Sequence, residues 1–382
     1  MNNLSGTIPP EIGNLTNLVY LDLNSNQISG TIPSQIGSLV KLQILRIFQN
    51  HLNGPIPGEI GPLRSLTKLS LGANSLNGSI PPSLGNLNNL FYLFLYENQL
   101  SGSVPKEIGY LRSLTELDLS INFLNGSIPP SLGNLNNFSL LSLYENHLSG
   151  SIPPEIGDLT NAKVFYAFSN ELFGPIPAEI GKMKLLQNLS LNTNNLFGLI
   201  PKTICNLTEF KLLDLYANQL SSPIPSELGK LKKLNDLLLS YNQLSGPIPS
   251  ELGKLQKLDD LGLSNNQLSG PIPSELGNLK NLNYLELDSN QLSGRIPTKI
   301  GYLRSLTELV LSTNSLSGSI PASLGDLNVT TRTEALAVTD NPFHGGLGAL
   351  LYLIRLTYEV VEENRLKALK GLTRMMSMGR LE

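Results

Sequence analysis

One asparagine recurs every 24 residues along almost the whole chain. Thirteen consecutive intervals separate fourteen such positions, each set in the pattern I-P-x-x-[LI]-G-x-L-x-x-L-x-x-L-x-L-x-x-N-x-L-x-G. A fixed period of this length is typical of solenoids, in which each repeat contacts only its neighbours. The first of the fourteen is Asn2, and the other thirteen form the predicted ladder: Asn26, Asn50, Asn74, Asn98, Asn122, Asn146, Asn170, Asn194, Asn218, Asn242, Asn266, Asn290 and Asn314.

The leucine spacing predicts how each repeat folds. In x-L-x-L-x the two leucines face one side of a short strand and the x residues face the other. One repeat cannot bury so small an apolar wedge alone, so stacked repeats merge their wedges into a continuous core. Because L-x-x-L-x-L-x-x-N-x-L is the signature of leucine-rich repeats, we expect an α/β repeat solenoid, a right-handed leucine-rich-repeat horseshoe or superhelix with a parallel concave β-sheet.

Polar and special residues of the pattern have separate roles. The Asn amide both donates and accepts, so it can satisfy backbone groups where the chain turns away from the strand. The Gly four residues later permits backbone angles closed to other residues. The Pro after Ile or Val fixes an extended backbone and removes a donor, which suits the outer edge of the coil.

The repeats divide the chain into three predicted segments. About fourteen regular repeats occupy residues 1–325, and residues 326–346 form one degenerate repeat whose Asn341 lies 27 residues after Asn314. Residues 347–382 lack the pattern, and their apolar spacing predicts an amphipathic helix. We expect this helix to be a C-terminal cap over the last repeat. A basic membrane-surface or calmodulin-target helix is the alternative for the same segment.

Bulk composition narrows the possible partners. The net charge of −3 and pI near 5.8 imply no basic face for a nucleic acid. No run of 18 apolar residues is present, so we expect no membrane span in this chain. The single cysteine excludes an internal disulfide framework.

Catalytic and metal chemistry find no support in the sequence. His51 and His147 are separated by four repeats, or about 19 Å of stacked strands, and cannot share a metal ion or relay a proton. Positions that are equivalent in successive repeats are called a column. Cys205 stands in a column that is Gly in most repeats, which favours a small packed residue over a nucleophile. GGLG at 345–348 is too short for a dinucleotide site. We therefore expect no enzymatic activity, no metal and no cofactor.

The segments LSGSIPPEIG (148–157) and LSGPIPSELG (244–253) carry a resemblance to a known family. They resemble the plant-specific extracellular leucine-rich repeats of receptor-like kinases and receptor-like proteins, and are also similar to polygalacturonase-inhibiting proteins. The resemblance covers about residues 1–325. It implies a glycosylated signalling or defence protein, extracellular in the apoplast or at the cell surface. Its partners would be a peptide or protein ligand and a co-receptor on the concave or lateral face.

Some features depart from this family. Its members normally open with a capping region that holds a cysteine pair and a tryptophan, whereas this chain has one Cys and no Trp and starts inside a repeat. This favours a fragment, a truncated product or an engineered chain. The family's paired arginines, which hold a peptide's terminal carboxylate, have no match because Arg46 stands alone in its column. Ligands with a free terminal carboxylate are therefore disfavoured.

Outward strand positions give the candidate binding residues. At six, four and two residues before the ladder Asn, aromatic residues gather in the first two thirds of the chain. We call them the aromatic strip and predict an exposed binding surface, with acidic residues following toward the C-terminus. The aromatic strip comprises Phe48, Tyr92, Phe94, Tyr96, Tyr144, Tyr166, Phe168 and Tyr216, and the acidic candidates are Asp260, Glu286 and Asp288. The competing explanation is a duplication, since residues around 65–90 and 113–138 are nearly identical.

Glycosylation triplets occur along the chain. The favoured N-x-S/T candidates need exposed loops or edges in an extracellular protein. They are Asn14, Asn77, Asn125, Asn206 and Asn328.

The pattern thus predicts a non-catalytic recognition module that binds a peptide or protein along its concave face. One alternative is a secreted inhibitor of a cell-wall-degrading enzyme, which would slow a polygalacturonase. A second is a structural or ice-binding repeat protein, which requires a flat, regular Thr or Asn array.

Overall fold

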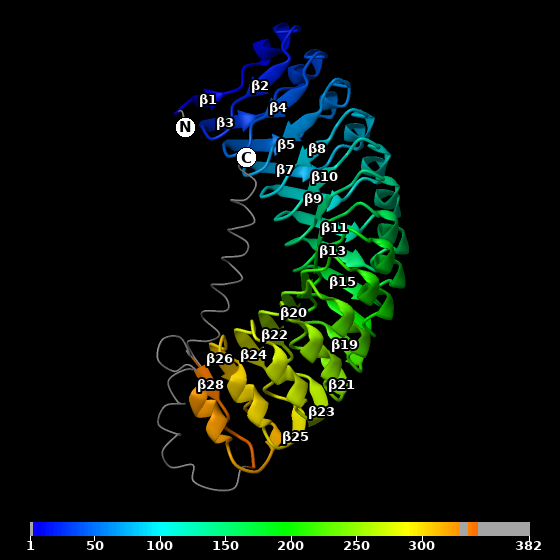
Figure 1. Ribbon diagram of the computed structural model, residues 1–382. Helices are drawn as coiled ribbons and strands as arrows, with labels where there is room; N and C mark the ends of the chain where they lie inside the picture. The colour runs from blue at the N-terminus through cyan, green and yellow to red at the C-terminus, as the bar shows by residue number, and fades with distance from the viewer. Residues whose placement is uncertain (1–2, 328–334, 343–382) are drawn as a thin grey trace.

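The structure is a computed structural model and describes residues 3–327 and 335–342. Its chain coils into a curved solenoid, with short helical turns along the outer edge of the N-terminal half (Figure 1). Two parallel sheets of fourteen strands run along it, one made of even-numbered and one of odd-numbered strands. The predicted leucine-rich-repeat solenoid is confirmed.

The even-numbered strands form the predicted inner sheet, one x-L-x segment from each repeat. Neighbours pair in register at 24-residue steps, as in Leu93 with Leu117, except where the last strand pairs with β26. Its strands are β2 (Tyr20–Asp22), β4 (Ile44–Arg46), β6 (Lys68–Ser70), β8 (Tyr92–Phe94), β10 (Glu116–Asp118), β12 (Leu140–Ser142), β14 (Val164–Tyr166), β16 (Asn188–Ser190), β18 (Leu212–Asp214), β20 (Asp236–Leu238), β22 (Asp260–Gly262), β24 (Tyr284–Glu286), β26 (Glu308–Val310) and β28 (Ala335–Ala337).

The odd-numbered strands form a second sheet that the sequence analysis did not expect. They begin just after the ladder Asn in nearly every repeat, in the segment interpreted above as a turn. These strands are β1 (Ser5–Thr7), β3 (Gln27–Thr31), β5 (His51–Pro55), β7 (Ser75–Ser79), β9 (Gln99–Ser103), β11 (Phe123–Ser127), β13 (His147–Gly150), β15 (Glu171–Gly174), β17 (Asn195–Gly198), β19 (Gln219–Ser222), β21 (Gln243–Gly246), β23 (Gln267–Pro271), β25 (Gln291–Gly294) and β27 (Ser315–Leu316).

A short 3-10 helix follows each second-sheet strand from β1 to β27. The Pro before it has extended backbone angles, as Pro153 does with φ −65° and ψ 136°, and so sets the direction in which the helix begins. These helices are η1 (Pro10–Asn14), η2 (Ser34–Ser38), η3 (Gly58–Ile60), η4 (Pro82–Asn86), η5 (Lys106–Tyr110), η6 (Pro130–Asn134), η7 (Pro154–Asp158), η8 (Ala178–Lys182), η9 (Lys202–Asn206), η10 (Ser226–Lys230), η11 (Ser250–Lys254), η12 (Ser274–Asn278), η13 (Thr298–Tyr302) and η14 (Ala322–Asp326).

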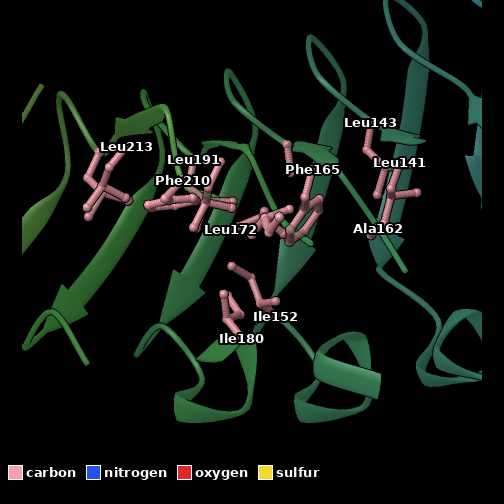
Figure 2. Close-up of a cluster of buried hydrophobic side chains, with 14 of the residues drawn as sticks. Leu141, Leu143, Ile152, Ala162, Phe165, Leu172, Ile180, Leu191, Phe210 and Leu213 are labelled. Atoms are coloured by element: carbon pink, nitrogen blue, oxygen red, sulfur yellow. The ribbon is translucent and has the colours of Figure 1, made fainter. Parts of the chain in front are cut away.

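The core is one continuous row of buried side chains between these three layers. Most are leucine and isoleucine, and Phe138, Phe165 and Phe210 replace an aliphatic residue where the repeats diverge. Figure 2 shows Phe165 and Phe210 among leucines from neighbouring repeats. Each repeat therefore shares its apolar contacts with the repeats before and after it, as expected for a stacked solenoid.

The Asn ladder closes the turn between the two sheets. Asn146 Nδ2 lies within hydrogen-bond distance of the carbonyl oxygens of Leu119 (3.0 Å), Leu143 (3.1 Å) and Tyr144 (3.2 Å). Its Oδ1 accepts from the backbone N–H of Leu124 at 3.0 Å. One amide thus joins its own turn to the repeat before it.

The degenerate terminal repeat retains the same construction. Strand β28 pairs with β26. Asn341 Oδ1 accepts from Leu316 N, and Asn341 Nδ2 donates to Leu311 O, both at 2.9 Å. The predicted helical cap at 347–382 lies outside the described residues.

Candidate functional site

The aromatic strip lies on the inner sheet. Tyr92 and Phe94 belong to β8 and Tyr166 to β14, on the side opposite the core leucines. Phe48, Tyr96, Tyr144, Phe168 and Tyr216 stand two residues beyond the ends of their strands. None of these rings belongs to the buried aliphatic cluster. The structure therefore brings the eight rings to one face.

The predicted exposure of these rings is wrong for three of them. Phe48, Tyr144 and Tyr166 are only 8%, 3% and 6% exposed. The reason is contact between neighbouring rings and repeats: Tyr144 stacks on Phe168 with centroids 4.4 Å apart and planes 7° apart. Tyr166 meets Phe168 edge-on at 6.2 Å. Within this part of the aromatic strip, Phe168 remains half-buried and presents the outer ring surface.

Small residues one repeat earlier make room for the tyrosines. A Cβ atom on Gly72 would lie 2.6 Å from Tyr96 Cε1, so this ring lies directly over the glycine. Tyr144 makes a side-chain hydrogen bond with Ser120, the residue in the same column one repeat earlier. Small and large residues partly alternate at this repeat position, and this alternation is the signal in the sequence that predicts the packing.

Hydrogen bonds fix the polar part of the same surface. Asn188 Nδ2 donates to the Tyr166 hydroxyl at 3.1 Å. Ser190 Oγ donates to Asp214 Oδ2 at 3.0 Å, and Asn192 Nδ2 donates to the same carboxylate. These contacts hold side chains from β14, β16 and β18 in one rigid surface.

Burial changes the ionisation of both central tyrosines. It raises the pKa of Tyr144 despite the hydrogen bond with Ser120. It also raises the pKa of Tyr166 despite the hydrogen bond with Asn188. Both phenols are neutral near pH 7, so these two tyrosines contribute neutral hydrogen-bonding groups to the surface.

The acidic candidates lie further along the inner sheet. Asp260 opens β22 beside Asp236 in β20, and Glu286 ends β24. Asp288 follows β24 and is buried, as is Glu286. Burial, reinforced by Asp259 and Asp214, raises the pKa of Asp236 to about 6.

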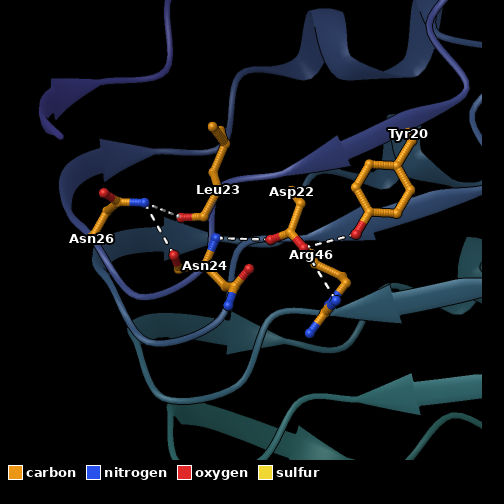
Figure 3. A network of polar contacts seen from close by, with 6 residues as sticks. All are labelled: Tyr20, Asp22, Leu23, Asn24, Asn26 and Arg46. Atoms are coloured by element: carbon orange, nitrogen blue, oxygen red, sulfur yellow. Dashed lines mark hydrogen bonds and ion pairs between the residues drawn. The ribbon is translucent and has the colours of Figure 1, made fainter. Parts of the chain in front are cut away.

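A cationic group at the N-terminal end was missed by the sequence analysis. Arg46 pairs with Asp22 at 3.1 Å, and Asp22 also accepts from the Tyr20 hydroxyl at 2.9 Å (Figure 3). Lys68 Nζ lies 5.3 Å from the Tyr92 ring centroid and 5.5 Å from that of Phe94. Arg46 is alone in its column, but Lys68 comes from the adjacent strand. Lys68 lies diagonally across the strand pair from Arg46, so the two residues do not share a repeat position.

The second sheet carries an apolar area that was also missed. Phe173, Phe197 and Leu199 are exposed on β15, β17 and the residue after β17. Leu199 lines a groove of about 850 Å³ together with prolines of the following repeats, including Pro223 and Pro247. The signal was present as Phe and Leu in columns that usually hold Ser, Asn or Pro.

The glycosylation candidates are exposed where the structure describes them. Asn14 and Asn206 end 3-10 helices, and Asn77 and Asn125 lie in second-sheet strands. Asn328 lies outside the described residues.

Cys205 is buried, and burial raises the pKa of its thiol to about 11. Within residues 3–327 and 335–342, no group of three His, Cys, Asp or Glu side chains could hold a metal ion. The same residues contain no helix long and apolar enough to cross a membrane.

Family comparisons agree with the repeat architecture. A leucine-rich-repeat family model matches residues 64–124, and a second matches 17–39, 137–159, 233–255, 257–279, 281–303 and 305–327. A solved leucine-rich-repeat protein of Leptospira interrogans, LIC12759, is 36% identical, with a TM-score of 0.70 over 89% of this chain and 82% of that one. This chain belongs to the leucine-rich-repeat family. A search of curated protein sequences finds no match.

Plant receptor ectodomains are among the similar leucine-rich-repeat structures. A TDR receptor is 33% identical with a TM-score of 0.85, over 90% of this chain and 59% of that one. The plant peptide hormone receptor RGFR1, solved in complex with RGF2, is 34% identical with a TM-score of 0.75, over 89% and 62%. The chain thus spans about three fifths of the length of these receptor structures.

Proposed function

We propose that this leucine-rich-repeat chain is a non-catalytic recognition module that binds a peptide or protein along its inner sheet. The observation that carries the proposal is the aromatic strip, whose rings lie outside the core and are held in place by stacking. Rigid, partly exposed rings offer much contact area for little entropy lost on binding. Similarity to receptor ectodomains, one of them solved with a peptide hormone, supports the same function.

The charge distribution suggests how a ligand would lie. Apolar groups would contact the aromatic strip, and a basic group would lie toward Asp260, Glu286 and Asp288. We propose an apoplastic or cell-surface location with glycans on exposed sequons, and a co-receptor as a further partner. The plant-specific character of the repeats belongs to the same proposal.

The test begins with peptides selected by phage display against the whole protein. Affinity of a selected peptide is then measured calorimetrically for Tyr96→Ala, Tyr144→Ala and Phe168→Ala. We expect a loss of about tenfold or more for the central rings, because buried aromatic anchors each contribute about 2 kcal/mol or more.

A matched control is Phe123→Ala, since Phe123 is exposed on the second sheet. Circular dichroism establishes that each variant is folded. Unchanged affinity in all three inner-sheet variants would refute the placement of the ligand. Inhibition of a polygalacturonase by the pure protein, with no effect of the ring variants, would favour the inhibitor alternative instead.

A further inference from the structure

Two glycosylation triplets of the second sheet have identical sequences around them. Residues 76–89 and 124–137 both read LNGSIPPSLGNLNN. Asn77 lies in β7 and Asn125 in β11, and both asparagines are exposed. The chain therefore contains a matched pair of sites for one modification, and any difference between them comes from their neighbours.

The residue two positions before the asparagine differs between the two sites. It is Phe123 before Asn125, but Ser75 before Asn77. Side chains two residues apart in a strand point to the same side, with Cα atoms about 7 Å apart. Leu124, which lies between them in β11, is fully buried. Phe123 and Asn125 therefore both face outward from the second sheet.

A second ring lies beside Asn125 on the neighbouring strand. In the pairing of β11 with β13, His147 stands directly opposite Asn125. The His147 ring stacks on the Phe123 ring, with centroids 6.1 Å apart and planes 12° apart. At the equivalent place in the pairing of β7 with β9, Asn77 stands opposite Gln99. One site thus adjoins two stacked rings, and the other has a serine and a glutamine in their positions.

The stacked rings leave apolar surface that a sugar can cover. Phe123 is still 53% exposed despite its contact with His147. One face of a pyranose ring carries C–H groups, and packing it on an aromatic ring removes apolar surface of both from water. A sugar on Asn125 is already tethered beside the rings, so this contact has a high effective concentration.

We propose that Asn125 carries an N-linked glycan whose first N-acetylglucosamine packs on Phe123 and His147. A glycan on Asn77 projects into solvent instead. This rests on the extracellular location proposed above and deepens it by distinguishing two otherwise equal sequons. In the modification, Nδ2 of Asn125 bonds to C1 of the sugar while the bond from C1 to the diphosphate of a lipid-linked oligosaccharide donor breaks. The nitrogen gives up one proton, and the secretory pathway of the cell supplies the donor.

The two sites can be compared within one molecule. The whole chain is secreted behind a cleavable leader from cultured cells in which mannose trimming is blocked, so that every occupied site carries the same glycan. Glycopeptide mass spectrometry then follows, site by site, how fast an endoglycosidase cuts between the first two sugars. In the folded protein we expect cleavage at Asn125 to be about fivefold slower than at Asn77, because contact with an aromatic ring protects the glycan core to about that extent. After denaturation the two rates should be equal.

Exchange of the residues before the asparagines tests the role of the ring. Phe123→Ser should raise the cleavage rate at Asn125 to that at Asn77, and Phe123→Leu should do so in part, since leucine is apolar but has no ring. Ser75→Phe should slow cleavage at Asn77. Phe197→Ser is the matched control and should leave both rates unchanged, because Phe197 is exposed elsewhere on the second sheet, in β17.

Three results would each overturn the proposal. They are an unoccupied Asn125 in the secreted protein, equal cleavage rates at the two sites in the folded protein, and an unchanged rate in Phe123→Ser. The recognition function is tested separately, since display peptides are selected and measured on protein from bacteria that attach no such glycan. Loss of peptide binding on Phe168→Ala with equal cleavage rates would leave only the recognition function standing, and slow cleavage at Asn125 with no peptide binder would leave only the packed glycan.

Discussion

Ser222 stands where thirteen other repeats have a glycine with positive φ. Its own φ is +79°, against +76° for Gly246 in the next repeat. An L-residue in this region costs about 1 to 2 kcal/mol, and glycine loses about 0.5 to 1 kcal/mol of extra chain entropy on folding. The difference predicts that Ser222→Gly stabilises the fold by about 0.5 to 1 kcal/mol.

The reciprocal change, Gly246→Ser, introduces the same backbone strain and should lower the free energy of unfolding. A Cβ on Gly246 would lie 3.5 Å from Pro223 Cγ, an ordinary contact, so crowding adds little. Gly246→Ser should therefore destabilise by about 0.5 to 1 kcal/mol through backbone angles alone. Ser221→Gly, one residue earlier in β19, is the matched control and should destabilise by about 0.5 to 1 kcal/mol, because its backbone angles suit any residue.

Urea unfolding followed by far-ultraviolet circular dichroism gives the free energy of unfolding. Hydrogen exchange of the peptide that spans residues 219–225 reports the local effect, since a solenoid can open one repeat at a time. If Ser222→Gly is no more stable than wild type, or if Gly246→Ser leaves the free energy of unfolding unchanged, strain at this turn does not limit stability.

Three further outcomes follow from the described contacts. Asn146→Ala, which loses the hydrogen bonds of one ladder amide, should lower the free energy of unfolding by about 3 kcal/mol in urea titrations. The pKa of Asp236 is raised to about 6, so the folded state binds a proton that the unfolded chain releases near pH 4, and stability falls as pH rises between these values. Asp236→Asn should flatten that slope and stabilise the protein at pH 7 by about 1 to 2 kcal/mol, allowing for screening. Buried Cys205, with a pKa of about 11, should resist a thiol reagent at pH 8 until the protein is unfolded.

The repeat pattern predicted the inner sheet because its evidence is periodic. Leucines such as Leu93 and Leu95 alternate with outward residues, and one slip in register would place them all on the wrong side. The second sheet was not predicted, because its strands contain Gly and Ser, which are weak strand formers in any single repeat. The ladder Asn, which bonds to the preceding repeat, holds successive turns next to each other where these strands pair.

The position of the aromatic rings on the inner sheet was predicted from the sequence, but their exposure was not. Column position follows from the period, so Tyr144 and Phe168 were assigned correctly to one face. Their burial depends on side-chain rotamers and on the size of neighbouring residues in other repeats. The residues at one repeat position do not determine either of these. Lys68 was missed for a similar reason, since its contact with Arg46 runs diagonally between columns.

Gly72, the glycine beneath Tyr96, bears on how the chain could be lengthened by duplication of repeats. Two repeats span 48 residues. The residues 48 positions after Gly72 and Tyr96 are Ser120 and Tyr144. A copied segment therefore carries each ring together with the small residue that accommodates it. Lengthening the chain by whole turns would add new aromatic rings already fitted to their surroundings, with no change to the existing ones.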